Sequence, residues 1–257
     1  MGRLARTFDE MIARLDDAFR RQRQFTADAS HELRTPLTAI KGQVEVALDQ
    51  PRDADAYRAV LRGVNAEVDR LIRLVGSLLT LARADAGQIP LARDTVDVAE
   101  LVNGAVEGVR STARQRHIAL TVDIGPIVVL HADEDLLLQL LLNLLDNALK
   151  HTPPGGQVRV GWRVRAGQLA LPVGDTGPGI APEHLPRIFD RFYRADPARD
   201  RAAGGAGLGL AIGRWIAEAH GGTVAATSAP GAGAVFTICL PLGGRERPPS
   251  GPAPPRL

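Results

Sequence analysis

The sequence has almost no cysteine, only two lysines and few aromatic residues. Its single cysteine, Cys239, cannot form a disulfide within the chain or supply a thiolate cluster, which excludes a disulfide-stapled secreted scaffold and a zinc ribbon. The lysines, Lys41 and Lys150, follow Ile40 and Leu149, so the chain has no Gly-Lys-Ser/Thr of a P-loop. Because aromatic residues make up only 4%, the core must be built from Leu, Val, Ile and Ala.

Long apolar runs and a strong excess of one charge are also missing. No stretch approaches the about 18 consecutive apolar residues of a membrane span, and no signal-peptide core follows Met1, so we expect the chain as given to be soluble. The net charge is +2, from 31 basic and 29 acidic residues whose signs are interspersed. This balance argues against a nucleic-acid partner, which usually requires a concentrated basic face.

The first part of the chain predicts a helical hairpin. A helical pattern, broken only by Pro36, runs from residue 2 to about residue 49. A turn follows at residues 50–53 with Asp53 as a new N-cap, and a second helix ends at Gly87. The first seam is Phe8, Met11, Leu15, Ala18, Gln22, Phe25 and Ala29, then, after a shift of phase, Leu33, Leu37, Ile40, Val44 and Ala47. The second seam is Leu61, Val64, Val68, Leu71, Val75, Leu78 and Ala82.

A lone hairpin cannot bury both seams, so we predict a homodimer in which two hairpins form a four-helix bundle. The alternative is that the hairpin packs on the rest of the chain instead.

The remainder predicts an α/β domain, in keeping with about 1.7 domains for 257 residues. Helices are expected over residues 97–115, 133–150 and 208–220, with Asp97 capping the first, and strands over 117–124, 127–131, 158–165, 169–173, 223–226 and 234–240. Pro172 and Gly174 predict that their strand is irregular or lies at a sheet edge. The proline-rich segment after residue 242 is expected to be disordered.

His31 is the first residue with a chemical interpretation. It lies two positions from the seam residue Leu33 and should therefore face solvent. A neutral imidazole is a competent nucleophile, and the neighbouring carboxylate of Glu32 can orient the ring and take its other proton. Residue 35 is Thr rather than His, which excludes the zinc-protease motif. Pro36 cannot donate to the Glu32 carbonyl and should loosen the helix there.

A second group of residues predicts a nucleotide site. Asn143 and Asn147 share one face of an apolar helix, where buried amides would be costly without a partner, and amide oxygens suit Mg²⁺. The segment from Asp175 to Gly179 offers a carboxylate beside backbone that a flat base can approach. The glycines of residues 204–209 open a helix whose N-terminus suits phosphate.

Together these residues resemble the sensor histidine kinases of two-component systems. Five motifs follow in that family's order: the histidine box at His31, the asparagine box 143–150, a glycine box 175–179, the phenylalanine box 188–194 and a second glycine box 205–209. The resemblance implies an α plus α/β fold, in which a dimeric four-helix bundle is followed by a GHKL-type α/β sandwich. The implied parts are the end of a HAMP linker at 1–20, the phosphoacceptor hairpin at 21–87, a hinge at 88–92, an ATP-binding domain at 93–242 and the tail at 243–257.

The resemblance assigns roles by motif position. His31 would accept the γ-phosphoryl group of ATP, Glu32 would act as its base, and Thr35 would place the water that dephosphorylates a response regulator. Asn147 would bind Mg²⁺, and Asp175 would bind the adenine amine. The other residues implied to bind ATP are Asn143, Lys150, His151, Gly177, Gly179, Ile180, Phe189, Arg191, Tyr193, Gly205, Gly207, Leu208, Gly209 and Leu210.

The implied partners are a second copy of the chain and the receiver domain of a response regulator. Since a HAMP linker follows a membrane span in such kinases, the chain would be the cytoplasmic part of a longer membrane protein. Two departures from the family concern base packing and phosphate contacts: His151 stands where Tyr or Phe is frequent, and Ala206 where Thr or Ser is frequent.

Two other functions remain open at this stage. A GHKL ATPase of the chaperone or topoisomerase type would carry Glu where Asn143 stands and would lack the hairpin. A degenerate kinase would bind ATP only to set the conformation of the hairpin, but intact His31, Asn147, Asp175 and Gly207 argue against it.

Overall fold

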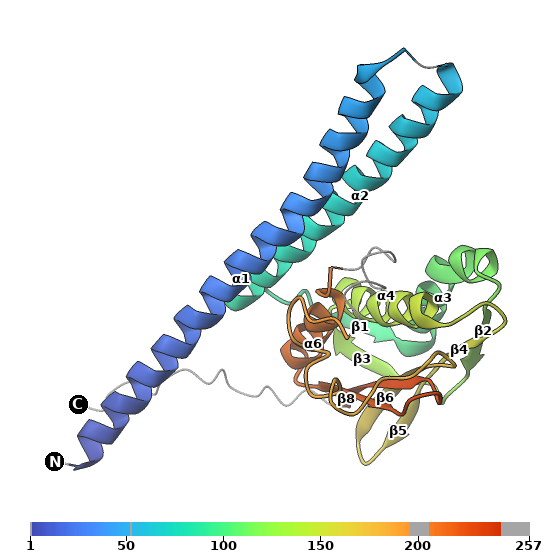
Figure 1. The fold of residues 1–257 in the computed structure, drawn as a ribbon. Coiled ribbons are helices and arrows are strands. Elements are labelled where there is room, and N and C mark those ends of the chain that lie inside the picture. The colour runs from blue at the N-terminus through green and yellow to red at the C-terminus, as the bar shows by residue number, and fades with distance from the viewer. Residues whose placement is uncertain (1, 52, 196–205, 243–257) are drawn as a thin grey trace.

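A computed structural model describes residues 2–51, 53–195 and 206–242. It shows a long helical hairpin with an α/β domain beside the half of the hairpin where α2 ends (Figure 1). Two sequence predictions, the site residue Gly205 and the proline-rich tail, lie outside the described residues. None of the helices in the described ranges combines the length and the apolar character that crossing a membrane requires.

The hairpin follows the predicted boundaries closely. Helix α1 (Gly2–Asp49) runs without a break for 48 residues through Pro36, and α2 (Ala54–Asp85) returns antiparallel beside it. The Asp53 side chain accepts a hydrogen bond from the backbone N–H of Ala56 at 2.7 Å, so it caps α2 as expected.

The apolar seam of α2 is divided between two faces, which corrects the prediction of a single seam. Leu74 and Leu81 are buried and join the core of the α/β domain, while Leu78 packs against it. The other face stays exposed in a single chain, and its positions alternate by 3 and 4, as in a coiled-coil interface. These exposed residues are Leu61, Val68, Ile72, Val75 and Leu79.

The α/β domain is a sheet covered on one face by three helices (Figure 1). The strand order is β2 (Ala119–Asp123), β4 (Gln157–Gly161), β6 (Gln168–Asp175), β8 (Ala234–Pro241) and β7 (Thr223–Ser228), with β5 (Arg163–Arg165) also pairing with β6. Only β2 and β4 are parallel within this sheet. The covering helices are α3 (Val98–Gln115), α4 (Glu134–His151) and α6 (Gly209–Ala219). A small separate sheet pairs β1 (Asp94–Asp97) with β3 (Val129–Ala132), and β1 is an element the sequence patterns did not predict.

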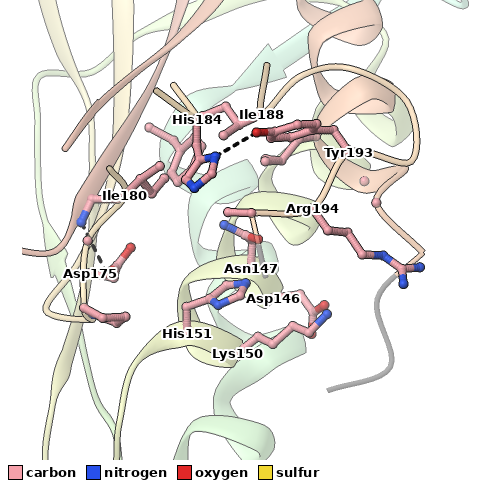
Figure 2. A pocket seen from close by; sticks show the side chains of 18 of the residues that line it. Asp146, Asn147, Lys150, His151, Asp175, Ile180, His184, Ile188, Tyr193 and Arg194 are labelled. Atoms are coloured by element: carbon pink, nitrogen blue, oxygen red, sulfur yellow. Dashed lines mark hydrogen bonds between the residues drawn. The ribbon is translucent and has the colours of Figure 1, made fainter. Parts of the chain in front are cut away.

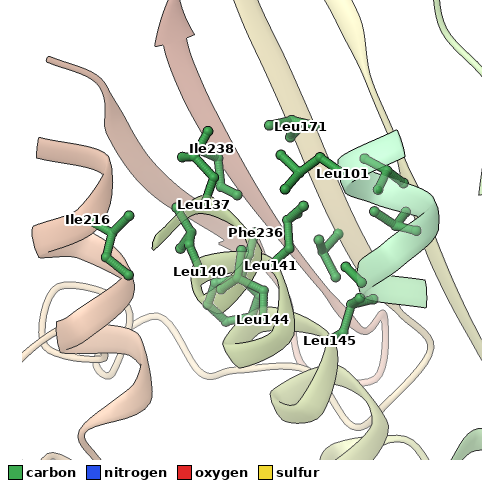
Figure 3. Packing of buried hydrophobic residues seen from close by; sticks show 14 of the residues in the cluster. Leu101, Leu137, Leu140, Leu141, Leu144, Leu145, Leu171, Ile216, Phe236 and Ile238 are labelled. Carbon is green, nitrogen blue, oxygen red and sulfur yellow. The ribbon is translucent and has the colours of Figure 1, made fainter. Parts of the chain in front are cut away.

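The core lies between α4 and the sheet and is built from Leu, Val, Ala and Ile, with Trp162 and Phe236 as its buried aromatic residues, as the scarcity of aromatic residues predicts (Figure 3). Leu140, Leu144 and Leu145 of α4 have no exposed surface, and Phe236 is the largest side chain buried with them. Because the apolar residues of α4 face the sheet and its neighbouring helices, the polar residues of the same helix are left on its remaining face.

Strand β6 corrects the prediction made from Pro172 and Gly174. It is a central strand, paired with β8 along its length and with β4 and β5 on the other side. On that other side β5 pairs with residues 168–170 and β4 with residues 173–175, so Pro172 lies at the change of partner. The proline therefore occupies a central strand at the one place where that side of the ladder is interrupted.

Candidate functional site

A cavity of about 480 Å³ opens between α4, the end of β6, the segment 178–195 and the start of α6 (Figure 2). Its size is within the range of small-molecule sites. Of the residues expected to bind a nucleotide, those that line it are Asn143, Asn147, Lys150, His151, Asp175, Gly179, Ile180, Tyr193, Gly207, Gly209 and Leu210. Gly177, Phe189, Arg191 and Leu208, which were also expected to bind the nucleotide, are not among its lining residues.

Helix α4 supplies the polar wall of the cavity. Asn143 and Asn147 lie one turn apart, and Lys150 and His151 follow in the last turn, where Figure 2 shows their side chains on the cavity side of the helix. The Asn143 side chain also donates to the carbonyl of Gly209 at 3.3 Å and so ties α4 to the start of α6. One helix thus holds two amides and a lysine in a row along the cavity.

Asp175 stands at the end of β6, on the opposite side of the cavity from Arg194 (Figure 2). Its Oδ1 accepts hydrogen bonds from the backbone N–H groups of Gly177 at 2.8 Å and Ala234 at 3.3 Å. Burial raises the pKa of this carboxyl, an effect that these two hydrogen bonds and the charge of His151 partly oppose. The result is a fixed, partly desolvated acceptor suited to an amine donor.

Close backbone packing shapes the wall next to Asp175. Gly179 has φ 74°, and a Cβ there would collide with the backbone of Ala229. The N–H of Ile180 donates to the Ser228 hydroxyl at 2.8 Å, and that hydroxyl donates to the Gly233 carbonyl. The turn between β7 and β8 therefore holds the glycine segment in place.

The N-terminus of α6 faces the cavity. Leu208 occupies its N-cap position without a side-chain hydrogen bond, and the first turn contains no acidic residue. Gly207, Gly209 and Leu210 line the cavity at this point. The free N–H groups and the positive end of the helix dipole favour an anion here.

His184 and Arg194 are among the lining residues that had no predicted role. His184 Nδ1 lies 2.8 Å from the Tyr193 hydroxyl, and the Arg187 guanidinium lies over the Tyr193 ring at 4.4 Å. The Arg194 side chain is 7% exposed, and its Nε has no hydrogen-bond partner among the described residues. Its position in an arginine-rich stretch was visible in the sequence, but nothing there distinguished it from its neighbours.

Arg194 also joins the cavity to the hairpin. Its Nη2 lies 2.6 Å from Oε2 of Glu32 on α1, and Glu32 directly follows His31 in the chain. His31 itself is exposed, as its place on the helix predicts, and the Thr35 hydroxyl donates to its carbonyl at 3.2 Å. Arg191, expected at the nucleotide, instead forms a two-point ion pair with Asp85 at the end of α2.

Comparisons with known proteins agree with this arrangement. Residues 21–87 match the His Kinase A (phospho-acceptor) domain, and residues 132–244 match the Histidine kinase-, DNA gyrase B-, and HSP90-like ATPase family. The sensor histidine kinase CusS of Escherichia coli O157:H7 is 40% identical over 241 residues, covering 94% of this chain and 50% of CusS. The chain thus spans about half the length of the curated relatives it matches.

Solved structures of histidine kinases are also similar, among them ShkA and MprB. ShkA in complex with AMPPNP is 33% identical, with a TM-score of 0.65 over 85% of this chain and 45% of that one. The mycobacterial sensor histidine kinase MprB is 33% identical, with a TM-score of 0.50 over 58% of this chain and 97% of that one. The two matched domains, their order and these relatives show that the chain belongs to the sensor histidine kinases of two-component systems.

Proposed function

We propose that the chain transfers the γ-phosphoryl group of ATP to its residue His31 and then to an aspartate of a response regulator. One observation carries this proposal: Arg194 lines the cavity and is bonded to Glu32, the neighbour of the exposed His31. The cavity of a nucleotide-binding fold therefore opens beside a candidate acceptor on the hairpin.

The cavity fits a nucleoside triphosphate with its base at Asp175 and its phosphates toward α6 and Arg194. The fixed Asp175 carboxylate suits the adenine amine. At the other end, the α6 N-terminus, Lys150 and the orphaned Nε of Arg194 offer positive charge and donors to phosphate oxygens. AMPPNP in the related ShkA structure supports this occupant.

Mg²⁺ fits the same end of the cavity. The Asn147 amide oxygen would supply one protein ligand, since Mg²⁺ commonly takes one or two protein contacts beside phosphates and water. When bound, the ion would neutralise charge on the phosphates that this chain's Lys150 and Arg194 also face.

In the transfer step, a ring nitrogen of His31 attacks the γ-phosphorus. A phosphorus–nitrogen bond forms, the bond to the oxygen bridging the β- and γ-phosphorus breaks, and ADP leaves with that electron pair. Glu32 takes the proton from the other ring nitrogen. The phosphoryl group then passes to a carboxylate oxygen of a receiver-domain aspartate, the phosphorus–nitrogen bond breaks, and the proton held by Glu32 returns to the ring, which regenerates neutral His31.

The remaining parts of the proposal concern partners and place. The exposed apolar residues of α2, called the exposed stripe, support a homodimer with a four-helix bundle; they are Leu61, Val68, Ile72, Val75 and Leu79. Thr35, one turn after His31, would place the water for dephosphorylating the regulator. Because residues 1–20 resemble the end of a HAMP linker, which follows a membrane span in such kinases, we propose that the whole protein sits in the cell membrane with this part in the cytoplasm.

Labelling with γ-phosphate-labelled ATP and Mg²⁺ tests the acceptor. We expect label on the chain that is lost in acid and stable in base, and that His31→Gln abolishes. His131→Gln is the matched control, since His131 is also exposed but lies on β3, away from the hairpin. Label that persists in His31→Gln would refute the assignment.

The phosphatase role of Thr35 has its own test. We expect Thr35→Ala to slow dephosphorylation of a cognate receiver domain severalfold while autophosphorylation continues. Thr38→Ala, which removes an equivalent hydroxyl bonded to the Arg34 carbonyl, is the control. Equal dephosphorylation rates for Thr35→Ala and the parent would remove Thr35 from the mechanism, and transfer profiling against a set of receiver domains would identify the partner.

A further inference from the structure

Side chains of the α/β domain contact the hairpin of the same chain at three of its residues, Asp85, Phe25 and Glu32. Arg191 pairs with Asp85 through two bonds of 2.7 and 2.6 Å. The Phe192 ring packs on Phe25 with 5.9 Å between centroids, and the Arg191 guanidinium lies 5.3 Å from the same Phe25 ring. The third contact is the 2.6 Å bond from Arg194 to Glu32. Three residues of one short segment, Arg191, Phe192 and Arg194, thus contact the hairpin.

These contacts fix a defined docking position. Phe25 and Glu32 are seven residues apart on α1, two helical turns or about 10 Å along one face. Asp85 ends α2, and Leu81, one turn earlier, is 1% exposed within the core of the α/β domain. Polar pairs at both ends and apolar packing between them hold the domain against its own two helices.

Docking brings each cavity to the histidine of its own chain. Arg194 reaches Glu32 from the cavity wall, and Glu32 is the residue after His31. The connection from Asp85 to β1 is only residues 86–93, and its far end is anchored where the Ala92 N–H donates to Asp133 at 2.9 Å. A connection this short spans at most about 29 Å even when extended, which keeps the domain near the hairpin from which it comes.

From this geometry we infer that autophosphorylation occurs in cis: the nucleotide held by one chain phosphorylates His31 of that chain and not His31 of the partner. The inference rests on the proposed function and adds the pairing of sites within the dimer. It also makes Arg194 and the Asp85–Arg191 pair positioning residues, because they set which His31 the cavity meets.

Mixed dimers test the inference. One chain carries His31→Gln with an intact cavity, and the other carries Asn147→Asp with an intact His31, each with a different tag so that heterodimers can be purified. We expect no label above background on either chain after incubation with labelled ATP and Mg²⁺. Label on the Asn147→Asp chain would overturn the inference, because only the partner's nucleotide could supply it.

Controls separate this result from failure of the proposed function. Wild-type homodimers must be labelled, since their failure would refute the kinase assignment itself. A heterodimer of wild type with His31→Gln must carry label on the wild-type chain, which shows that mixed dimers are active. Asp175→Asn replaces Asn147→Asp in a second set, so that misfolding of one variant cannot imitate the expected loss.

A charge exchange tests the docking contact independently. Asp85→Arg and Arg191→Asp should each slow autophosphorylation about twofold to fivefold, as loss of a partly exposed ion pair predicts. Combined in one chain they should restore the rate, whereas a heterodimer of the two single variants should stay slow. Recovery of the rate in that heterodimer would show that the contact runs between chains and would overturn the inference, because the double variant restores the ion pair in either arrangement.

Discussion

The hairpin and the α/β domain use apolar residues in opposite ways. In the α/β domain the large apolar side chains of α4 are turned inward, and Leu144 has no exposed surface. In the hairpin Leu61 is 66% and Ile72 is 64% exposed in a single chain. The α/β domain is therefore complete in one copy, whereas the hairpin presents a surface that a second copy would cover.

The largest expected loss of stability comes from a substitution in the core of the α/β domain. Leu144→Ala removes a fully buried side chain from the core and should lower the free energy of unfolding by about 3 kcal/mol, at every protein concentration. Both tryptophans, Trp162 and Trp215, lie in this domain, so their fluorescence in a urea titration measures its unfolding alone. Leu48→Ala, at a side chain that is 78% exposed, should change the result by less than about 0.5 kcal/mol.

The hairpin should respond differently to a change on its exposed stripe. Ile72→Asn removes apolar surface from the predicted interface of each chain, at a cost of about 2 kcal/mol per side chain in the dimer. We expect a dimer dissociation constant raised by at least about tenfold in sedimentation, with unchanged tryptophan unfolding. An unchanged dissociation constant would show that the stripe is not the interface.

A smaller effect should follow from the cap of α2. Asp53→Ala removes the acceptor for the Ala56 N–H and should cost about 1 kcal/mol of hairpin stability, seen by far-UV circular dichroism. Asp53→Asn keeps an acceptor and should recover most of the loss. If tryptophan fluorescence shifts as much as the dichroism, the hairpin and the α/β domain unfold together, and the α/β domain is not stable independently of the hairpin.

The smallest expected effect is a pH dependence of the stability of the α/β domain, caused by His220. Its Nδ1 donates to the Ile216 carbonyl at 2.8 Å, and its Nε2 accepts from the Asp133 N–H at 3.1 Å, so the ring is neutral. Burial lowers its pKa below the ordinary 6.5, and nearby Arg93 acts in the same direction, while the Ile216 carbonyl and Asp133 oppose the shift.

The unfolded chain therefore binds a proton at His220 that the folded chain excludes. The contribution of neutral His220 to the free energy of unfolding should be fully present above about pH 6.5, the pKa in the unfolded chain. It should fall as the pH drops from there toward the lower pKa of His220 in the folded chain. Urea titrations followed by tryptophan fluorescence between pH 7.5 and 5 should show this decline. In His220→Asn the decline should be smaller, and an equal slope in both proteins would exclude His220 as its cause.

Local chemistry in the sequence predicted most of the elements. The spacing of Asn143 and Asn147 in a leucine-rich helix, the caps at Asp53 and Asp97, and the pattern of α1 each depend on neighbours within a few residues. The failures came where distant partners decide. Strand β1 forms because it pairs with β3. Strand β6 accepts Pro172 because β5 pairs with the residues before it and β4 with the residues after it on the same side of the strand.

In the site, too, the residues of local motifs were predictable and those that depend on distant partners were not. Asp175 and Lys150 were recognisable from their motifs and line the cavity. The family resemblance assigned Arg191 to ATP and gave Arg194 no role, whereas their contacts in the fold depend on Asp85 and Glu32, which lie 106 and 162 residues away along the chain. No local pattern records such a pairing, so only the folded chain separates these two arginines.

The unbroken length of α1 has a mechanical consequence. Glu32 lies 30 positions after Gly2, about 45 Å along a single helix with no irregular segment between them. A continuous helix of this kind is rigid, so a rotation or an axial shift applied at its first turn is transmitted to Glu32. Because the Arg194 guanidinium contacts α1 from one side, a quarter turn of α1 about its axis would move the Glu32 carboxylate out of hydrogen-bonding distance.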